Sequence, residues 1–229
     1  MLNSNIMVPH PDGGIPGFLS QPETGSSTGV ILVSAIFGVD EDTKKMCSDL
    51  ASQGFPALAL NMFWEDEQDA GVLAVEEIGR ASARSKRIDR DRCNEYVKLA
   101  IESLKSQPTC SGKIVLFGFC FGGPFVIQAG VDALIDGGVV FHGSYVEKFL
   151  SGFQSISCPL EFHYGDNDKT APMESVNIVK AACDSKKNAS LYIYSDGEHG
   201  YMFPNRGSMY QKKAAELSWS RAIDFLKTL

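Results

Sequence analysis

Short apolar runs alternate with segments of helical periodicity along the chain, and this alternation limits the possible folds more than any other feature of the sequence. Strands are expected at residues 29–33, 55–60, 113–117, 138–141, 160–164 and 191–194. Helices are expected at residues 42–53, 91–105, 122–129, 173–183 and 208–226, and residues 64–87 are expected to mix loop and short helix. The pattern predicts an α/β fold, a mostly parallel twisted sheet with helices on both faces. Ligands bind such sheets beyond the carboxyl ends of the strands.

The length of 229 residues and the mass of 24.9 kDa fit a single domain that spans residues 1–229. Apolar residues make up 44% of the chain and charged residues 21%, which excludes intrinsic disorder. The net charge of −7 argues against a wide basic surface for nucleic acid or an anionic membrane. We therefore expect a small-molecule substrate, no nucleic-acid or membrane partner, and a monomer or homodimer.

Six cysteines are scattered through the chain, and their spacing argues against a metal site or a disulfide framework. None forms a CxxC pair, and none has a histidine at metal-ligand spacing. Scattered cysteines are typical of a reducing compartment, and the first twelve residues lack the features of a secretory signal, so we expect a cytoplasmic protein. Walker and dinucleotide-binding glycine motifs are absent, and no metal or other cofactor is expected.

Residues 114–131 form the most apolar stretch of the chain. Four glycines and Pro124 interrupt this stretch, which is unfavourable for a single membrane-spanning helix. A buried strand that runs into a buried helix explains the stretch better.

The turn between that strand and helix carries the sequence Gly118-Phe119-Cys120-Phe121-Gly122. This is the G-x-nucleophile-x-G pattern, in which residues without Cβ let a tight strand-to-helix turn present the central side chain. The amide of Phe121, at the start of the helix, is placed to lower the pKa of the Cys120 thiol and to bind an oxyanion. The alternative is a buried cysteine in a glycine-rich packing turn.

Two later segments each follow an expected strand and carry the other residues of a catalytic triad. Asp166 and Asp168 follow the strand at 160–164, and His199 follows the strand at 191–194. The order nucleophile, acid, histidine is that of α/β-hydrolases. In such a triad Cys120 attacks a carbonyl carbon, His199 exchanges the proton and the aspartate fixes the imidazole. Taken separately, a loop histidine and an Asp-Asn-Asp turn are common without any catalytic role.

The other three histidines have weaker patterns. His10 is expected in an exposed turn that is rich in proline and glycine. His142 ends a strand, where lining a pocket and filling the core are equally plausible. His163 is expected to be a structural residue within its strand.

The chain resembles the dienelactone hydrolase (carboxymethylenebutenolidase) family, small α/β-hydrolases with a Cys-His-Asp triad. The segment Gly-Phe-Cys-Phe-Gly-Gly is similar to the Gly-Tyr-Cys-Leu-Gly-Gly of that family, and the His-Gly-Tyr at 199–201 is similar to its catalytic histidine segment. The resemblance covers about residues 13–226 and implies an α/β-hydrolase fold, with Cys120, Asp168 and His199 as the triad. It favours Asp168 over Asp166.

The resemblance also implies the activity, which is hydrolysis of an ester or lactone through a thioester on the cysteine. The Ile-Phe-Gly-Val at 36–39 matches a family segment, so the Ile36 amide would join Phe121 as an oxyanion donor. Possible substrate contacts are drawn from aromatic side chains and from arginines in the regions where the family binds the substrate carboxylate. They are Phe37, Trp64, Tyr145, Tyr201, Arg84, Arg87 and Arg206.

The chain departs from the family at two positions that concern the substrate. The family has a glutamate, which pairs with the resting thiol, where this chain has Ala35. The family arginine that follows the catalytic histidine is replaced by Phe203, and Arg206 lies three residues later. Two alternatives therefore stay open: a carboxylesterase or thioesterase with another substrate, and a non-catalytic ligand-binding or thiol-sensing protein on the same scaffold.

Overall fold

All residues from Met1 to Leu229 are described by the computed structural model, and they form two units, Met1–Val115 and Leu116–Leu229. Strand β5 crosses the boundary between them, because it runs from Cys110 to Phe119. The single-domain organisation that the chain length suggests stays a prediction.

The first unit is built on four strands and three α-helices. The strands are β1 (Leu2–His10), β2 (Gly13–Gln21), β3 (Ser27–Val33) and β4 (Ala57–Leu60), in the order β1-β2-β4-β3. β3 and β4 are parallel, whereas β2 pairs antiparallel with both β1 and β4. The helical segments are α1 (Glu41–Ser52), the 3₁₀ turn η1 (Val75–Glu77), α2 (Ile78–Arg87) and α3 (Arg90–Lys105).

Side-chain caps fix where the helices of this unit begin. Asp40 accepts a hydrogen bond from the amide of Thr43 at 2.9 Å and starts α1. Gly54, with φ +94°, takes a left-handed conformation just after the end of α1. Asp89 likewise caps α3 by accepting from the amides of Asp91 and Arg92. The helix expected at 42–53 is present with both ends one residue earlier, and the helix expected at 91–105 begins one residue earlier and ends as predicted.

The N-terminal hairpin of β1 and β2 carries no clear sequence signal. Most residues of β1 are exposed, so the strand lacks the alternation of apolar and polar residues that marks a half-buried strand. His10 pairs with Gly13 across a two-residue turn. The expectation that His10 is exposed is wrong, because its side chain is only 5% exposed and its ring packs against Trp64 and Tyr96.

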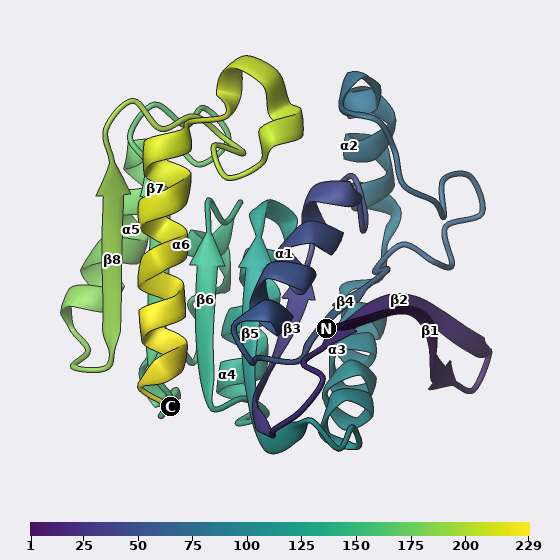
Figure 1. Cartoon of the computed structure of the whole chain (residues 1–229). Helices are drawn as coiled ribbons and strands as arrows, with labels where there is room; N and C mark the ends of the chain where they lie inside the picture. The colour runs from purple at the N-terminus through teal and green to yellow at the C-terminus, as the bar shows by residue number, and fades with distance from the viewer. The chain divides into compact units, whose positions relative to one another are not determined.

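The second unit holds the end of β5 and three further strands, in the order β5-β6-β7-β8. The strands are β6 (Gly137–Phe141), β7 (Leu160–Gly165) and β8 (Ala189–Tyr194), and both β6–β7 and β7–β8 are parallel. The α-helices are α4 (Gly123–Val131), α5 (Met173–Asp184) and α6 (Lys212–Lys227). Helix α6 crosses one face of these strands, and α4 and α5 lie on the other (Figure 1).

Short 3₁₀ turns connect the larger elements of this unit. They are η2 (Cys120–Gly122), η3 (Val146–Phe149), η4 (Phe153–Ser155) and η5 (Pro204–Met209). The helix expected from residue 208 begins only at Lys212, because Tyr210 and Gln211 before it have extended backbone conformations.

The predicted α/β fold is confirmed, with mostly parallel strands that alternate with helices. The apolar residues 114–131 are the end of β5 followed by η2 and α4, as the glycines in that stretch suggested. No helix combines the length and the apolar character needed to cross a membrane.

Candidate active site

Cys120 occupies a tight turn between β5 and α4, the setting that the glycine pattern predicts. Its backbone has φ +52°, a left-handed conformation that costs free energy in a residue other than glycine. A Cβ atom at Gly118 would overlap the carbonyl of Gly122, and one at Gly123 would lie 2.9 Å from the Cα of Gly143. The turn can therefore form only because these positions lack side chains. Cys120 is 7% exposed.

Asp168 lies in the loop after β7 and is held by three hydrogen bonds. Its Oδ1 atom accepts from the amides of Thr170 and Ala171 at 2.7 and 2.9 Å. Its Oδ2 atom lies 2.7 Å from Nδ1 of His199. Asp166 is directed elsewhere, because its exposed carboxylate accepts from the amide of Asp196 at 2.7 Å. Of the two candidate acids, Asp168 is the one that meets the histidine.

Two glycines bring the loops of Asp168 and His199 together. A Cβ atom at Gly165, the last residue of β7, would overlap the carbonyl of Gly197. The amide of Asn167 donates to that same carbonyl at 3.0 Å. Backbones can approach this closely only where neither residue carries a side chain. The 2.7 Å contact between Asp168 and His199 depends on this approach.

His199 is polarised between Asp168 and Cys120. Its Nδ1 atom faces Asp168, its Nε2 atom is buried, and the imidazole interacts with the Cys120 thiol. Burial lowers the pKa of the imidazole, but the charges of Cys120 and Asp168 outweigh burial and raise that pKa to about 10. Burial conversely raises the pKa of the Cys120 thiol, yet the charge of His199 dominates and brings it below its usual value. The two shifts favour a proton on His199 over one on the sulfur of Cys120.

A loop that follows β6 contacts both members of this pair. The hydroxyl of Ser144 lies 3.4 Å from the sulfur of Cys120, and the amide of Ser144 donates to the Cys120 carbonyl at 2.9 Å. The ring of His142 packs against His199 and is completely buried. Sequence reasoning missed Ser144. The available signal was its position just beyond the carboxyl end of a parallel strand, where sites gather in this class of fold.

The other predicted contacts in this unit differ in exposure. Tyr145 is 51% exposed, with the ammonium of Lys148 over its ring. Tyr201 is completely buried and packs against His142. Arg206 is 6% exposed, and its guanidinium lies 5.1 Å from the ring centre of Phe203. Arg206 is thus a nearly buried positive charge in the segment that follows the histidine.

Arg84 is placed in the first unit and is completely buried there. Its guanidinium donates to the backbone carbonyls of Asp69, Gly71 and Ile36 and lies 4.0 Å from the ring centre of Phe63. These contacts use most of its donors. They favour a structural role, which is to hold the segment that contains Ile36.

The remaining predicted residues also lie in the first unit. Phe37 is buried, and its carbonyl accepts from the amide of Leu73 at 3.0 Å. Trp64 is half-buried beside His10. Arg87 forms ion pairs with Asp66 and Asp69, which favours a structural role for this arginine also.

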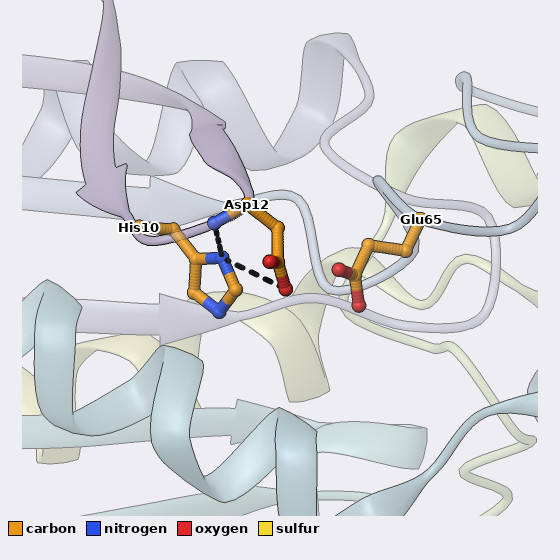
Figure 2. A group of neighbouring side chains, drawn as sticks. All are labelled: His10, Asp12 and Glu65. Carbon is orange, nitrogen blue, oxygen red and sulfur yellow. Dashed lines mark hydrogen bonds and ion pairs between the residues drawn. The ribbon is translucent and has the colours of Figure 1, made fainter.

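A second cluster of titratable groups lies at the N-terminal hairpin. Ligand atoms of His10, Asp12 and Glu65 all lie within 4.8 Å of one another (Figure 2). The guanidinium of Arg92 donates to Asp12 at 2.9 Å and to Glu65 at 2.5 Å. Because an arginine already supplies the positive charge that these carboxylates require, the cluster gives no support to a metal site.

Comparisons with known proteins find relatives along almost the whole chain. Residues 15–229 match the dienelactone hydrolase family. Carboxymethylenebutenolidase 1 of Cupriavidus pinatubonensis and carboxymethylenebutenolidase of Pseudomonas putida are each 25% identical to this chain, over all of it and 98% of their own length.

Solved structures with the same fold also align with this chain over almost the whole length of both proteins. The dienelactone hydrolase-like promiscuous phosphotriesterase P91 from metagenomic libraries has a TM-score of 0.85 at 22% identity and covers 100% of this chain and 98% of its own. The α/β hydrolase GrgF from Penicillium sp. sh18 has a TM-score of 0.73 at 15% identity and covers 100% and 99%. These similarities show an α/β-hydrolase fold.

Proposed function

The chain belongs to the dienelactone hydrolase family and is a hydrolase of that kind, and on this premise we propose that it cleaves an ester or lactone through a thioester on Cys120. The observation that carries the proposal is the 2.7 Å contact between Asp168 and His199, with His199 electrostatically coupled to a buried thiol. An acid, a base and a nucleophile in this relation generate a reactive thiolate at neutral pH.

The first half of the reaction forms the thioester. The Cys120 thiolate attacks the carbonyl carbon, and the carbonyl oxygen takes the negative charge. The amide of Phe121 is the proposed donor to this oxyanion, and removing such a donor typically costs about 3–4 kcal/mol of barrier. The bond to the leaving oxygen then breaks, and that oxygen takes the proton from His199. In a lactone the leaving oxygen stays attached to the acyl group.

The second half restores the enzyme. Once the thioester has formed, the negative charge of the sulfur is gone and His199 is neutral. It takes a proton from water as the water attacks the thioester carbonyl. The tetrahedral intermediate expels the thiolate, which leaves a carboxylic acid product and the original thiolate–imidazolium pair. Asp168 holds Nδ1 of His199 throughout and stabilises each imidazolium.

Arg206 supports a substrate that carries a carboxylate. The name of the relatives denotes a butenolide lactone with a carboxymethylene group. A nearly buried guanidinium in the segment that follows His199 provides the complementary charge. We therefore propose Arg206, rather than Arg84 or Arg87, as the residue that binds the substrate carboxylate.

Ala35 favours a second candidate, a carboxylesterase or thioesterase with another substrate, because the residue at this position carries no charge to pair with a thiol. Two parallel assays distinguish the candidates. One monitors hydrolysis of a dienelactone by ultraviolet absorbance, and the other measures hydrolysis of p-nitrophenyl acetate. Turnover of the dienelactone that is lost in Cys120→Ala supports the proposal. Acetate cleavage alone supports the second candidate, and inactivity on both substrates contradicts both in favour of a binding or sensing protein.

A further inference from the structure

We infer that Ser144 is a further catalytic residue, whose hydroxyl donates a hydrogen bond to the Cys120 thiolate and keeps the resting nucleophile ionised. The inference rests on the proposed function, because it takes Cys120 as the nucleophile. Its basis is the 3.4 Å distance between Ser144 Oγ and Cys120 Sγ.

The charge distribution decides which of the two atoms donates. The 3.4 Å contact allows either atom to donate, and the pKa shifts of Cys120 and His199 favour the state in which the proton lies on His199. In that state the sulfur is an anion and can only accept. The serine hydroxyl is then the donor. Because Ser144 is 5% exposed and Cys120 is 7% exposed, little water is available to replace this hydrogen bond.

The backbone around Ser144 is built to hold the hydroxyl in place. His142, two residues before Ser144, and Tyr145, directly after it, have φ values of +40° and +61°, conformations that residues other than glycine rarely adopt. The amide of His142 donates to the carbonyl of His163 at 2.7 Å, and the amide of Ser144 donates to the carbonyl of Cys120 at 2.9 Å. Left-handed residues of this kind persist where surrounding contacts fix them, and they cluster at active sites.

Ser144 therefore contacts Cys120 through two atoms: its amide donates to the Cys120 carbonyl, and its hydroxyl lies against the sulfur. Only the second contact uses the hydroxyl. The substitution Ser144→Ala removes one oxygen atom and keeps the backbone contact, so it isolates the hydrogen bond to the thiolate. The same bond favours expulsion of the thiolate when the thioester is hydrolysed, because the sulfur regains its charge at that step.

The test is an ultraviolet titration of the thiolate in the wild type and in Ser144→Ala, each corrected with a Cys120→Ala background. Cys93 and Cys183 contribute little thiolate absorbance near neutral pH, because burial raises their pKa values to about 12. Loss of one hydrogen bond to the charged form is expected to raise the pKa of Cys120 by about one, which is a tenfold smaller thiolate population at acidic pH.

Two further variants make the result specific. Ser218→Ala removes another completely buried serine hydroxyl, one that donates within α6 to the carbonyl of Ala214, and it should leave the thiol pKa unchanged. Ser144→Thr retains a hydroxyl and should keep the pKa close to that of the wild type.

An unchanged pKa in a folded Ser144→Ala protein, with the wild-type pKa still depressed, would overturn the role of Ser144 alone. A wild-type Cys120 thiol with an ordinary pKa would instead contradict the proposed function, so the two failures are distinguishable. If Ser144→Ala raises the pKa and Ser218→Ala raises it equally, the effect is one of general destabilisation and the inference is wrong.

Discussion

The ring of His142 lies 5.0 Å from the ring of His199, with the two planes at 84° to each other. Neither ring nitrogen of His142 has a hydrogen-bond partner. Burial, together with the positive charges of His199 and Arg206, holds the pKa of His142 well below its usual value, so this ring is neutral. His199 is thus fixed on one side by the Asp168 carboxylate and supported on another by an uncharged aromatic ring.

This packing predicts different results for two substitutions of His142. His142→Phe retains an aromatic ring and should keep kcat within about threefold of the wild type. His142→Ala leaves a cavity and should lower both kcat and the free energy of unfolding, the latter by about 3 kcal/mol as for other buried aromatic truncations. Steady-state kinetics and urea denaturation measure the two effects. An equally large loss of kcat in His142→Phe would mean that the ring nitrogens take part in the reaction.

Asp168 and Asp166 offer a matched pair for the role of the acid. Asp168→Asn removes the charge next to Nδ1 of His199 and should lower kcat by about 10³- to 10⁴-fold, with little loss of folded structure. Asp166→Asn changes a carboxylate that accepts a hydrogen bond from the amide of Asp196 and does not contact His199, so turnover should stay near normal. Ester hydrolysis by both variants gives the answer. The reverse pattern would assign the catalytic acid to Asp166.

The coupled pKa values predict the pH range of the reaction. Below the depressed pKa of Cys120 the thiolate is protonated, so kcat/KM should fall as the pH becomes acidic. Above about 10 the imidazolium of His199 loses the proton that the leaving oxygen requires, so kcat/KM should fall again. The profile is thus a bell whose acidic limb lies below the usual pKa of a cysteine thiol and whose alkaline limb lies near pH 10. In His199→Ala, alkylation of Cys120 by iodoacetamide should shift to higher pH, because the charge that lowers the thiol pKa is gone.

The close approach of Gly165 and Gly197 predicts a large cost for a small side chain. Gly165→Ala places a methyl group against the Gly197 carbonyl and should lower the free energy of unfolding by about 3 kcal/mol, as overpacking does elsewhere. Gly79→Ala is the control, because its methyl group meets open space within α2 and should stabilise the helix by about 0.5–1 kcal/mol. Urea denaturation compares the variants. Similar stabilities for both would contradict the packing described for the two loops.

Much of the fold and part of the candidate site could be predicted because their signals are local. The glycines around Cys120 mark a turn that few other sequences can form. The strand before His199 is a run of aliphatic and aromatic residues, and in the strand before Asp168 such residues alternate with Glu161 and His163. The pattern alone did not choose between Asp166 and Asp168. That choice came from the family resemblance, and only the loop geometry shows which carboxylate meets His199.

The remaining features depend on contacts between distant parts of the chain. Ser144 and His142 acquire their neighbours because β6 ends beside the turn that carries Cys120, which no local pattern around residue 144 encodes. Arg84 is a similar case. A lone arginine is usually exposed, but here three backbone carbonyls compensate the burial of its charge.

The most direct test of the account is to identify the acylated residue. Wild-type protein and Cys120→Ala are mixed briefly with p-nitrophenyl acetate, quenched in acid and analysed by peptide mass spectrometry. The account predicts one acetyl group on the peptide that contains Cys120, absent from the variant and removed by hydroxylamine as a thioester. An acetyl group on another residue, or undiminished turnover by Cys120→Ala, would contradict it.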